Sequence, residues 1–210
     1  MVTDGPAVLI LVLSRRSEPF RSLEAAQRAT WMSELPPNVR VLHYWATTAP
    51  LVTMPTRLLL RLLEWTPRIR TRVLRWFGRR ASARSHDGSL KLDMPDVFHL
   101  INAKTIGAFR YVAAYESFDY VYRVNSSAYV DVLLLLEWLG SLPRHECYAG
   151  SVVRKSSFPY VFGAGIALSR DLVAKCASAE DWNYSVIDDR AIGLFMDHIG
   201  VAPSITRIST

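Results

Sequence analysis

Two adjacent carboxylates, Asp188 and Asp189, precede a segment that reads as a helix reaching about His198. A carboxylate within hydrogen-bond reach of a hydroxyl can accept its proton, so this pair is a candidate general base. Repulsion between two such neighbours tends to raise the pKa of one of them. The alternative is a helix cap, in which the acids only offset the helix dipole.

A second polar cluster, Asn125-Ser126-Ser127, follows an apolar strand expected over 120–124. Ligands of open α/β sheets bind at the carboxyl ends of strands, so these side chains are placed to hydrogen-bond a ligand. The alternative is a turn or N-cap leading into a helix over 130–142. The cluster also matches a glycosylation sequon, but a strand end in a chain without a secretion signal argues against that use.

The two glycines of Gly163-Ala164-Gly165 resemble part of a dinucleotide fingerprint. Leu168 stands where the third glycine belongs, and the motif precedes a strand instead of following one, so we reject that interpretation. Close backbone approach to a ligand or a tight corner before the strand explains both glycines. The sequence has no G-K-[ST] phosphate loop, G-x-S-x-G elbow or H-E-x-x-H motif, and its five histidines show no ligand spacing.

The elements that must position these residues begin with a continuous apolar run, 7–13, typical of a strand buried on both faces. A helix over 22–35, with Ser22 as N-cap and Pro36-Pro37 as its stop, precedes a second strand over 39–45. Strand–helix–strand in the first 45 residues indicates a doubly wound α/β sheet.

The same rhythm continues along the rest of the 210 residues, which we interpret as a single α/β domain with a mostly parallel sheet flanked by helices. Half of the residues are hydrophobic, enough for a sizeable core. Strands are expected over 90–94, 147–153 and 163–169, and helices over 97–116 and 170–179.

A basic insertion, residues 51–85, interrupts this rhythm with nine arginines and one acid, Glu64. Apolar residues alternate with the arginines at helical spacing, Pro67 divides two expected helices, and 79–88 resembles a mobile loop. An amphipathic helix on an anionic membrane, touching it through 54–80, fits this pattern. A helical subdomain packed over the sheet fits it equally. Nucleic acid is not an expected partner, because no recognition motif accompanies the charge.

The two cysteines, Cys147 and Cys176, form no disulfide framework, which favours a reducing compartment. No charged region precedes the first apolar run, and that run is too short to cross a bilayer. We expect a cytoplasmic protein, peripheral at the membrane if the basic insertion binds lipid.

Six short blocks occur in the order in which the β1,3-galactosyltransferase and Fringe-like glycosyltransferases have them. They are Arg28-Ala-Thr30-Trp31 for "R-x-T-W", Asn102-Ala-Lys104-Thr105 for "N-L-T-x-K-T", Tyr122 to Val130 for the "D-D-D" strand end, Tyr148-Ala-Gly150 for "Y-x-G", Gly163 to Leu172 for "G-G-G-Y-v-L-S-R-D-L", and Asp188 to Gly193 for "E-D-V-x-x-G". The match runs from about residue 8 to 201 and excludes the basic insertion.

The resemblance implies a GT-A fold, which is Rossmann-like, and inverting transfer of a hexose or N-acetylhexosamine from a nucleotide sugar, usually a UDP-sugar. The acceptor would be a glycan or a lipid-linked sugar. The family's general base maps to Asp189, with Asp188 as its helper. Its donor site maps to Asn125, Ser126 and Ser127 together with Gly163 and Gly165.

The sequence departs from the family where its aspartate cluster binds a divalent metal such as Mn or Mg. Ser127 stands at the last aspartate, and a neutral hydroxyl is a poor ligand for a hard cation. Either cationic side chains stabilise the diphosphate, or catalysis is lost. The candidate cations are Arg15, Arg28, Lys104 and Arg123. The leading hypothesis is metal-independent transfer; a non-catalytic sugar-nucleotide or glycan-binding module and a basic membrane adaptor are the alternatives.

Overall fold

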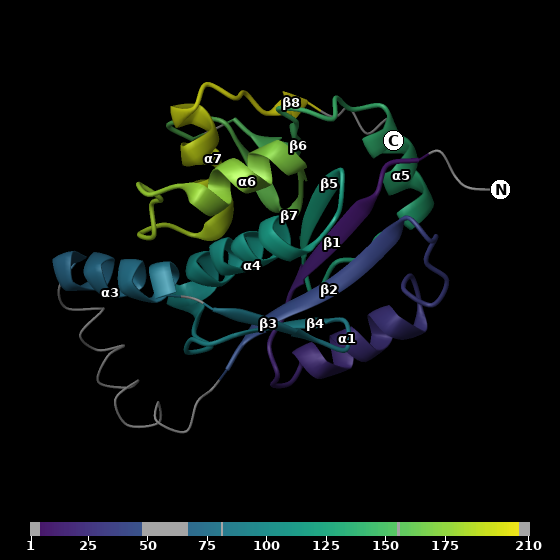
Figure 1. Cartoon of the computed structure of the whole chain (residues 1–210), viewed down its shortest axis with the longest axis horizontal. Coiled ribbons are helices and arrows are strands. Elements are labelled where there is room, and N and C mark those ends of the chain that lie inside the picture. Colours follow the sequence, from purple (N-terminus) through teal and green to yellow (C-terminus); the bar gives the residue numbers. More distant parts are fainter. Residues whose placement is uncertain (1–4, 48–66, 81, 155, 206–210) are drawn as a thin grey trace.

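A computed structural model describes residues 5–47, 67–80, 82–154 and 156–205 of the chain (Figure 1). The first part of the basic insertion, through residue 66, lies outside these residues. The strands are β1 Val8–Leu13, β2 Val39–Ala46, β3 Ala83–His86, β4 Ser89–Leu92, β5 Tyr120–Asn125, β6 Tyr148–Val153, β7 Tyr160–Ser169 and β8 Ser204–Ile205. The helices are α1 Phe20–Ala29, α3 Pro67–Arg80, α4 Ile101–Tyr115, α5 Val132–Gly140, α6 Arg170–Ser178 and α7 Asp188–His198, and a 3-10 turn, Phe98–Leu100, leads into α4.

One sheet of eight strands, in the order β3-β4-β2-β1-β5-β7-β6-β8, runs through the domain. Strands β4, β2, β1 and β5 pair in parallel, whereas β7 is antiparallel to both β5 and β6. The expected α/β class with a mostly parallel core is confirmed. The carboxyl ends of β1, β2 and β5 therefore meet at one edge of the sheet, where ligands of such folds bind.

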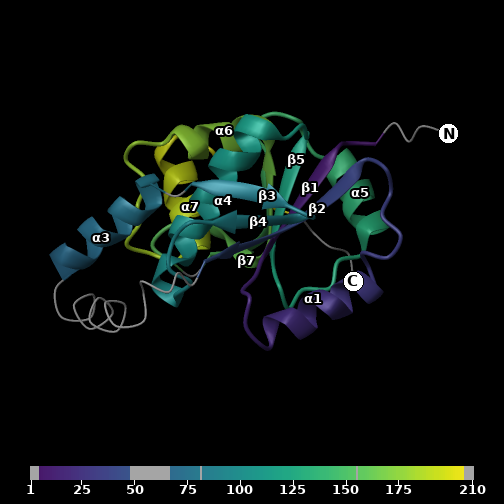
Figure 2. The ribbon, with the colours of Figure 1, turned by 60° about the horizontal axis from the view of Figure 1, so that its bottom comes forward.

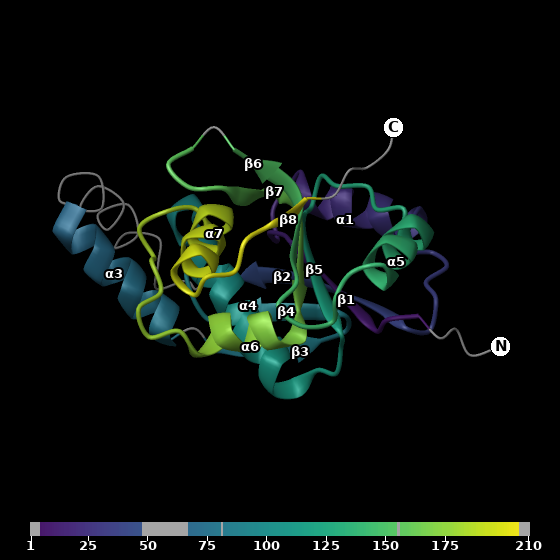
Figure 3. The same ribbon diagram turned by 90° about the horizontal axis from the view of Figure 1, so that it is seen from above.

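Helices cover both faces of the sheet. Figure 3 shows α1 and α5 on one side and α4, α6 and α7 on the other, and Figure 2 gives the same arrangement from a second direction. Alternate residues of β1 feed two separate cores: Leu9 and Leu11 join one, and Val8, Ile10 and Val12 join the other. This explains why β1 is apolar throughout, because a strand buried on both faces has no polar side.

Two expectations about local structure were wrong. The segment 79–88 is not a mobile loop: α3 continues to Arg80, and β3 pairs with β4 as a hairpin. Asp87 and Gly88 form its turn with φ of +46° and +70°, the left-handed conformation that two-residue hairpin turns require. The glycines 163 and 165 lie within β7, not at a corner before it.

The first helix also begins earlier than expected. It starts at Phe20, so Ser22 is inside the first turn and is not its N-cap. The Glu18 carboxylate accepts from the Ser22 backbone N–H at 3.3 Å and its hydroxyl at 2.7 Å, and thus supplies the capping acceptor from outside the helix. The helix ends at Ala29, six residues before Leu35.

The described part of the basic insertion is a helix packed against the domain. Leu74 of α3 is buried, Phe77 joins the same core, and Arg110 of α4 donates to the Gly78 carbonyl. This is the packed-subdomain arrangement. Trp76 remains 51% exposed among arginines of the same helix, so membrane contact stays a prediction. Among the described residues, no helix is long and apolar enough to span a bilayer.

Gly193 of α7 packs directly against β7: a Cβ added there would lie 2.4 Å from the Cβ of Tyr160. We expect Gly193→Ala to lower the free energy of unfolding by about 1–3 kcal/mol, because overpacking outweighs the better helix propensity of alanine. Urea titration measures this. Gly140→Ala, in α5 with only Pro6 Cδ at 4.0 Å, is the control and should cost nothing. Equal stabilities of the two variants would contradict the close packing of α7 on β7.

Candidate functional site

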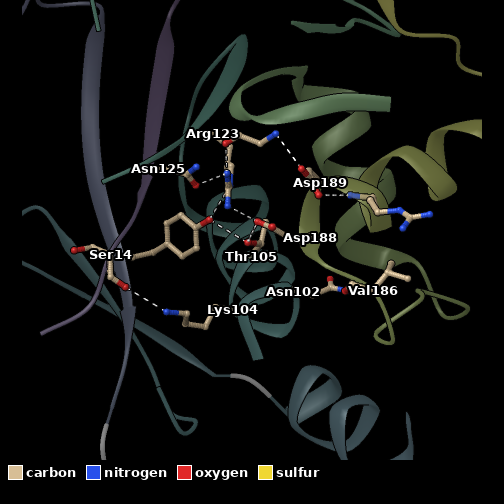
Figure 4. A network of polar contacts seen from close by, with 12 residues as sticks. Ser14, Asn102, Lys104, Thr105, Arg123, Asn125, Val186, Asp188 and Asp189 are labelled. Carbon is tan, nitrogen blue, oxygen red and sulfur yellow. Dashed lines mark hydrogen bonds and ion pairs between the residues drawn. The ribbon is translucent and has the colours of Figure 1, made fainter. Parts of the chain in front are cut away.

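A buried polar network lies at the carboxyl edge of the parallel strands (Figure 4). Its centre is Arg123 of β5, whose side chain is 2% exposed. The Arg123 Nη2 donates to Asp188 Oδ2 at 2.5 Å, and its Nε donates to the Tyr44 hydroxyl at 3.2 Å. Its Nη1 donates to Asn125 Oδ1 at 2.9 Å and to the Gly163 carbonyl. The guanidinium thus joins β2, β5, β7 and α7.

Asp188, the first residue of α7, has a second partner. The Thr105 hydroxyl of α4 donates to the same Asp188 oxygen at 2.8 Å, and the hydroxyls of Thr105 and Tyr44 lie 3.0 Å apart. Burial works against a charged Arg123, but Asp188, Tyr44 and Asp189 together outweigh it and raise the pKa of Arg123 above its ordinary value. This is a hydrogen-bonded ion pair, the form in which buried charges are tolerated.

Asp189 is held differently, by main-chain groups. Its Oδ2 accepts from the Gly163 N–H at 3.1 Å, and its Oδ1 accepts from the Arg190 N–H at 2.7 Å. Burial raises the pKa of Asp189, and the neighbouring Asp188 charge adds to the increase. A carboxylate with a raised pKa is a stronger base, so of the two acids Asp189 is better suited to take a proton.

A second buried ion pair lies beside the first network. Lys104 of α4 is 1% exposed; its Nζ donates to Asp96 Oδ1 at 2.8 Å and to the Ser14 carbonyl, directly after β1, at 3.2 Å. Burial lowers the pKa of Lys104, and Asp96 opposes that effect. Arg15 approaches Asp96 from the other side, with Nε 3.4 Å from Oδ2.

A pocket of about 220 Å³ opens next to this pair, beyond the ends of β1 and β2. It is lined by Arg15, Arg16, Ser17, Trp45, Ala46, Thr47, Lys91 and Asp96. Three cations and one acid give its wall a positive balance. Trp45 Nε1 and Thr47 Oγ1 are buried and have no hydrogen-bond partner among the described residues.

Sequence reasoning missed Arg16, Trp45 and Lys91 as site residues. The signal was available for Trp45, which closes the second apolar strand, and for Arg16, which follows the first. Lys91 gave no signal, because its place beside Trp45 depends on the pairing of β4 with β2.

The segment Asn125-Ser126-Ser127 ends β5 and turns, as the alternative interpretation had it: the Ala128 N–H donates to the Asn125 carbonyl at 3.0 Å. Only Asn125 points its side chain into the Arg123 network (Figure 4). Ser126 is buried, and the Gln27 side chain donates to its carbonyl at 2.7 Å, while Ser127 is exposed. The turn is thus tied to α1.

Two other residues predicted to bind the donor, Arg28 and Gly165, have structural roles outside the Arg123 network. Arg28 lies on the exposed side of α1 and pairs with Glu24 at 2.9 Å; Arg16 of the pocket lies 3.9 Å from the same acid. A Cβ at Gly165 would lie 2.2 Å from the Tyr122 hydroxyl, so this glycine makes room for an aromatic ring. The structure therefore brings together Asp188, Asp189, Arg123, Asn125 and Gly163, with Lys104 and Arg15 adjoining, and leaves Arg28 and Ser127 outside.

No family model and no curated protein matches this sequence. Among solved structures, the fold is similar to that of the mannosyltransferase PcManGT from Pyrobaculum calidifontis in complex with GDP-Man and Mn2+, with a TM-score of 0.55 and 14% identity. The match covers 97% of this chain and 55% of the mannosyltransferase, so the chain spans about half the length of that protein. At this identity the likeness shows a glycosyltransferase-like α/β fold; it gives no specific support to the β1,3-galactosyltransferase and Fringe-like group.

His43 of β2 gives the fold a pH dependence. Its ring is fully buried, with Nε2 2.9 Å from Gln27 Oε1 and Nδ1 4.0 Å from Glu24, and burial lowers its pKa from 6.5 to about 4. The Glu24 carboxylate opposes this effect and raises the pKa of His43, whereas Arg28 and Arg16 lower it further. Between pH 6.5 and pH 4, His43 is therefore protonated in the unfolded chain but neutral in the folded protein. The free energy of unfolding consequently falls as the pH drops through this window.

We expect unfolding at pH 5 to cost about 2 kcal/mol less than at pH 7 on account of His43. His43→Gln, which keeps a polar partner for Gln27 but cannot titrate, should lose most of that difference in urea titrations at the two pH values. His198→Gln, at an exposed position in α7, should keep it. The same pH slope in wild type and His43→Gln would show that His43 is not its source.

Proposed function

We propose that this domain transfers a hexose or N-acetylhexosamine from a nucleoside diphosphate sugar to a hydroxyl of a glycan or lipid-linked acceptor, with inversion. The observation that carries the proposal is the pairing of a cation-lined pocket with buried adjacent carboxylates at one edge of the sheet. Asp96 lines the pocket and pairs with Lys104, and this ion pair lies beside the network that holds the two carboxylates. A glycosyltransferase-like fold supports the same interpretation.

The pocket suits the nucleotide part of the donor. Arg15, Arg16 and Lys91 supply the positive charge that a diphosphate needs, and guanidinium groups bind phosphate oxygens in a fixed fork. The indole N–H of Trp45 and the Thr47 hydroxyl offer hydrogen bonds to a base or ribose. The blocks shared with the galactosyltransferase and Fringe-like group favour a UDP-sugar; the similar fold bound to GDP-Man makes GDP-sugars the second class to test.

In the proposed reaction the Asp189 carboxylate takes the proton of the acceptor hydroxyl. The hydroxyl oxygen forms a bond to the anomeric carbon while the bond from that carbon to the diphosphate breaks. The diphosphate leaves with the electron pair, and the pocket cations stabilise its charge. Attack opposite to the leaving group inverts the anomeric carbon.

The described residues do not fit a divalent metal. They contain no group of three or more His, Cys, Asp or Glu side chains that could hold one. Both Asp189 oxygens accept main-chain N–H groups, and Asp188 Oδ2 accepts from Arg123 and Thr105. Asn125 and the two serines that follow it have no carboxylate with which to bind a divalent cation. We therefore assign the neutralisation of the diphosphate to side chains, and expect turnover that EDTA does not reduce.

We expect Asp189→Asn to lower turnover by about 10²–10⁴-fold, since an amide cannot take the proton. The measurement is release of UDP or GDP from a panel of UDP-sugars and GDP-mannose, with and without simple glycoside acceptors. Asp197→Asn, exposed on the same helix, is the matched control and should retain activity. Full activity of Asp189→Asn would remove it as the base, and donor binding without turnover in wild type would instead identify a non-catalytic binding module.

We expect Arg15→Gln and Lys91→Gln each to weaken the binding of UDP or GDP by about tenfold or more, the value of one charge-assisted hydrogen bond. Isothermal titration calorimetry measures this on the apo protein. Arg84→Gln is the control, because Arg84 lies opposite Lys91 in the β3–β4 ladder but does not line the pocket. Equal affinities for all three variants would place the nucleotide elsewhere.

A further inference from the structure

Arg123 occupies an unusual place for a charged residue. It lies in a central strand between β1 and β7, and its guanidinium is almost wholly removed from water. Taking a charge out of water costs several kcal/mol, and a buried ion pair seldom repays more than that cost. Such an arrangement is weak evidence for stability, so its geometry deserves a functional explanation.

The four contacts of Arg123 leave it little capacity for a donor phosphate. The Nε is committed to Tyr44, the Nη1 to Asn125 and Gly163, and the Nη2 to Asp188. A phosphate would have to displace one of these partners and leave it buried without a bond. The cations that line the open pocket, in contrast, are partly in contact with solvent.

The contacts connect both acids through one glycine. The Gly163 carbonyl accepts from Arg123, and the Gly163 N–H donates to Asp189. A Cβ at this position would lie 3.1 Å from Asp189 Oδ2 and 3.2 Å from Arg123 Nη1, so a larger residue would press on both contacts. Arg123 thus binds Asp188 directly and fixes the main chain that binds Asp189.

We propose that Arg123 is a positioning residue and the fixed cation of the site: it holds Asp188 and, through Gly163, the base Asp189, and does not contact the donor phosphates. The role of Asp189 as a base rests on the proposed transferase function. The positioning of the two acids by Arg123 can be tested without any turnover. The charge of Arg123 also lowers the pKa of Asp189, which burial and the Asp188 charge raise.

The test compares Arg123→Gln and Arg123→Lys with wild type. In the apo protein, 13C-carboxyl NMR follows the titration of the two acids, assigned with Asp188→Asn and Asp189→Asn. Because the charge of Arg123 lowers the pKa of Asp189, loss of that charge in Arg123→Gln should raise the pKa of Asp189 by about one unit or more. Arg123→Lys keeps the positive charge and should change this pKa less. It should still shift the Gly163 amide resonance, because an ammonium lacks the planar guanidinium fork that contacts four partners.

Arg110→Gln is the matched control. Arg110 of α4 also makes three structural contacts, to the Ala177 carbonyl, the Gly78 carbonyl and the Tyr184 hydroxyl, and pairs with no acid in the described part of the chain. It should leave the titration of the pair and the Gly163 resonance unchanged. Affinity for UDP and GDP, measured by calorimetry, should stay within about twofold of wild type in Arg123→Lys, whereas the pocket variants lose it.

An unchanged titration in Arg123→Gln would overturn the proposal. So would a loss of UDP and GDP affinity in Arg123→Lys as large as that of the pocket variants, since Arg123 would then contact phosphate. If Arg123→Gln does not fold, Arg123→Lys decides alone: a wild-type Gly163 resonance excludes the positioning role. Failure of the transferase function is a separate result, recognised by wild-type protein that shows the expected titration but releases no nucleotide from any donor.

Discussion

A charge that is removed from water needs a counter-charge, and this constraint organises the whole carboxyl edge of the sheet. Two buried pairs satisfy it: Arg123 with Asp188, and Lys104 with Asp96. The first pair joins residues that are 65 positions apart, whereas Asp96 and Lys104 are only 8 positions apart. The first ties β5 to α7, and the second ties α4 to the segment after β4, with the Ser14 carbonyl as a further acceptor. Helix α7, which carries Asp188, and helix α4, which carries Lys104, are therefore both fixed to the carboxyl edge of the sheet.

The register of the parallel strands decides which residues can meet there. Leu13 of β1 stands opposite Tyr44 of β2 on one side and Asn125 of β5 on the other. The two polar residues thus reach the edge at the same level, and Arg123, two residues before Asn125, shares its side of β5. A shift of one residue would turn these side chains to the opposite face, where the second core lies. The burial of alternate β1 residues in the two cores and the polar network at the carboxyl edge consequently depend on the same register.

The sequence predicted the elements better than their contacts. A continuous apolar run located β1, the strand expected over 39–45 corresponds to β2, and the acids at 188–189 were correctly placed at the start of a helix. The strand expected over 90–94 corresponds to β4, but the β3–β4 hairpin was missed although Asp87-Gly88 is a strong turn signal, because 79–88 was interpreted as a mobile loop. The inward position of Arg123 also had a signal: an arginine within an apolar strand must be paired if that strand is central. The partner could not be named, since Asp188 is 65 residues away and reaches it only through tertiary packing.

The neutral residues at 125–127 and the cation at 123 are best understood together. Around Arg123 the two acids of α7 already exceed the one positive charge, and burial and Asp188 both raise the pKa of Asp189. A carboxylate in place of Asn125 would add a third negative charge within reach of the same guanidinium and would compete with Asp188 for it. The amide oxygen of Asn125 accepts the hydrogen bond without that charge. Neutral side chains at this strand end therefore match a site in which Arg123 supplies the positive charge. An added carboxylate at Asn125, or the loss of the Arg123 charge, would each leave an excess of negative charge beside Asp188 and Asp189.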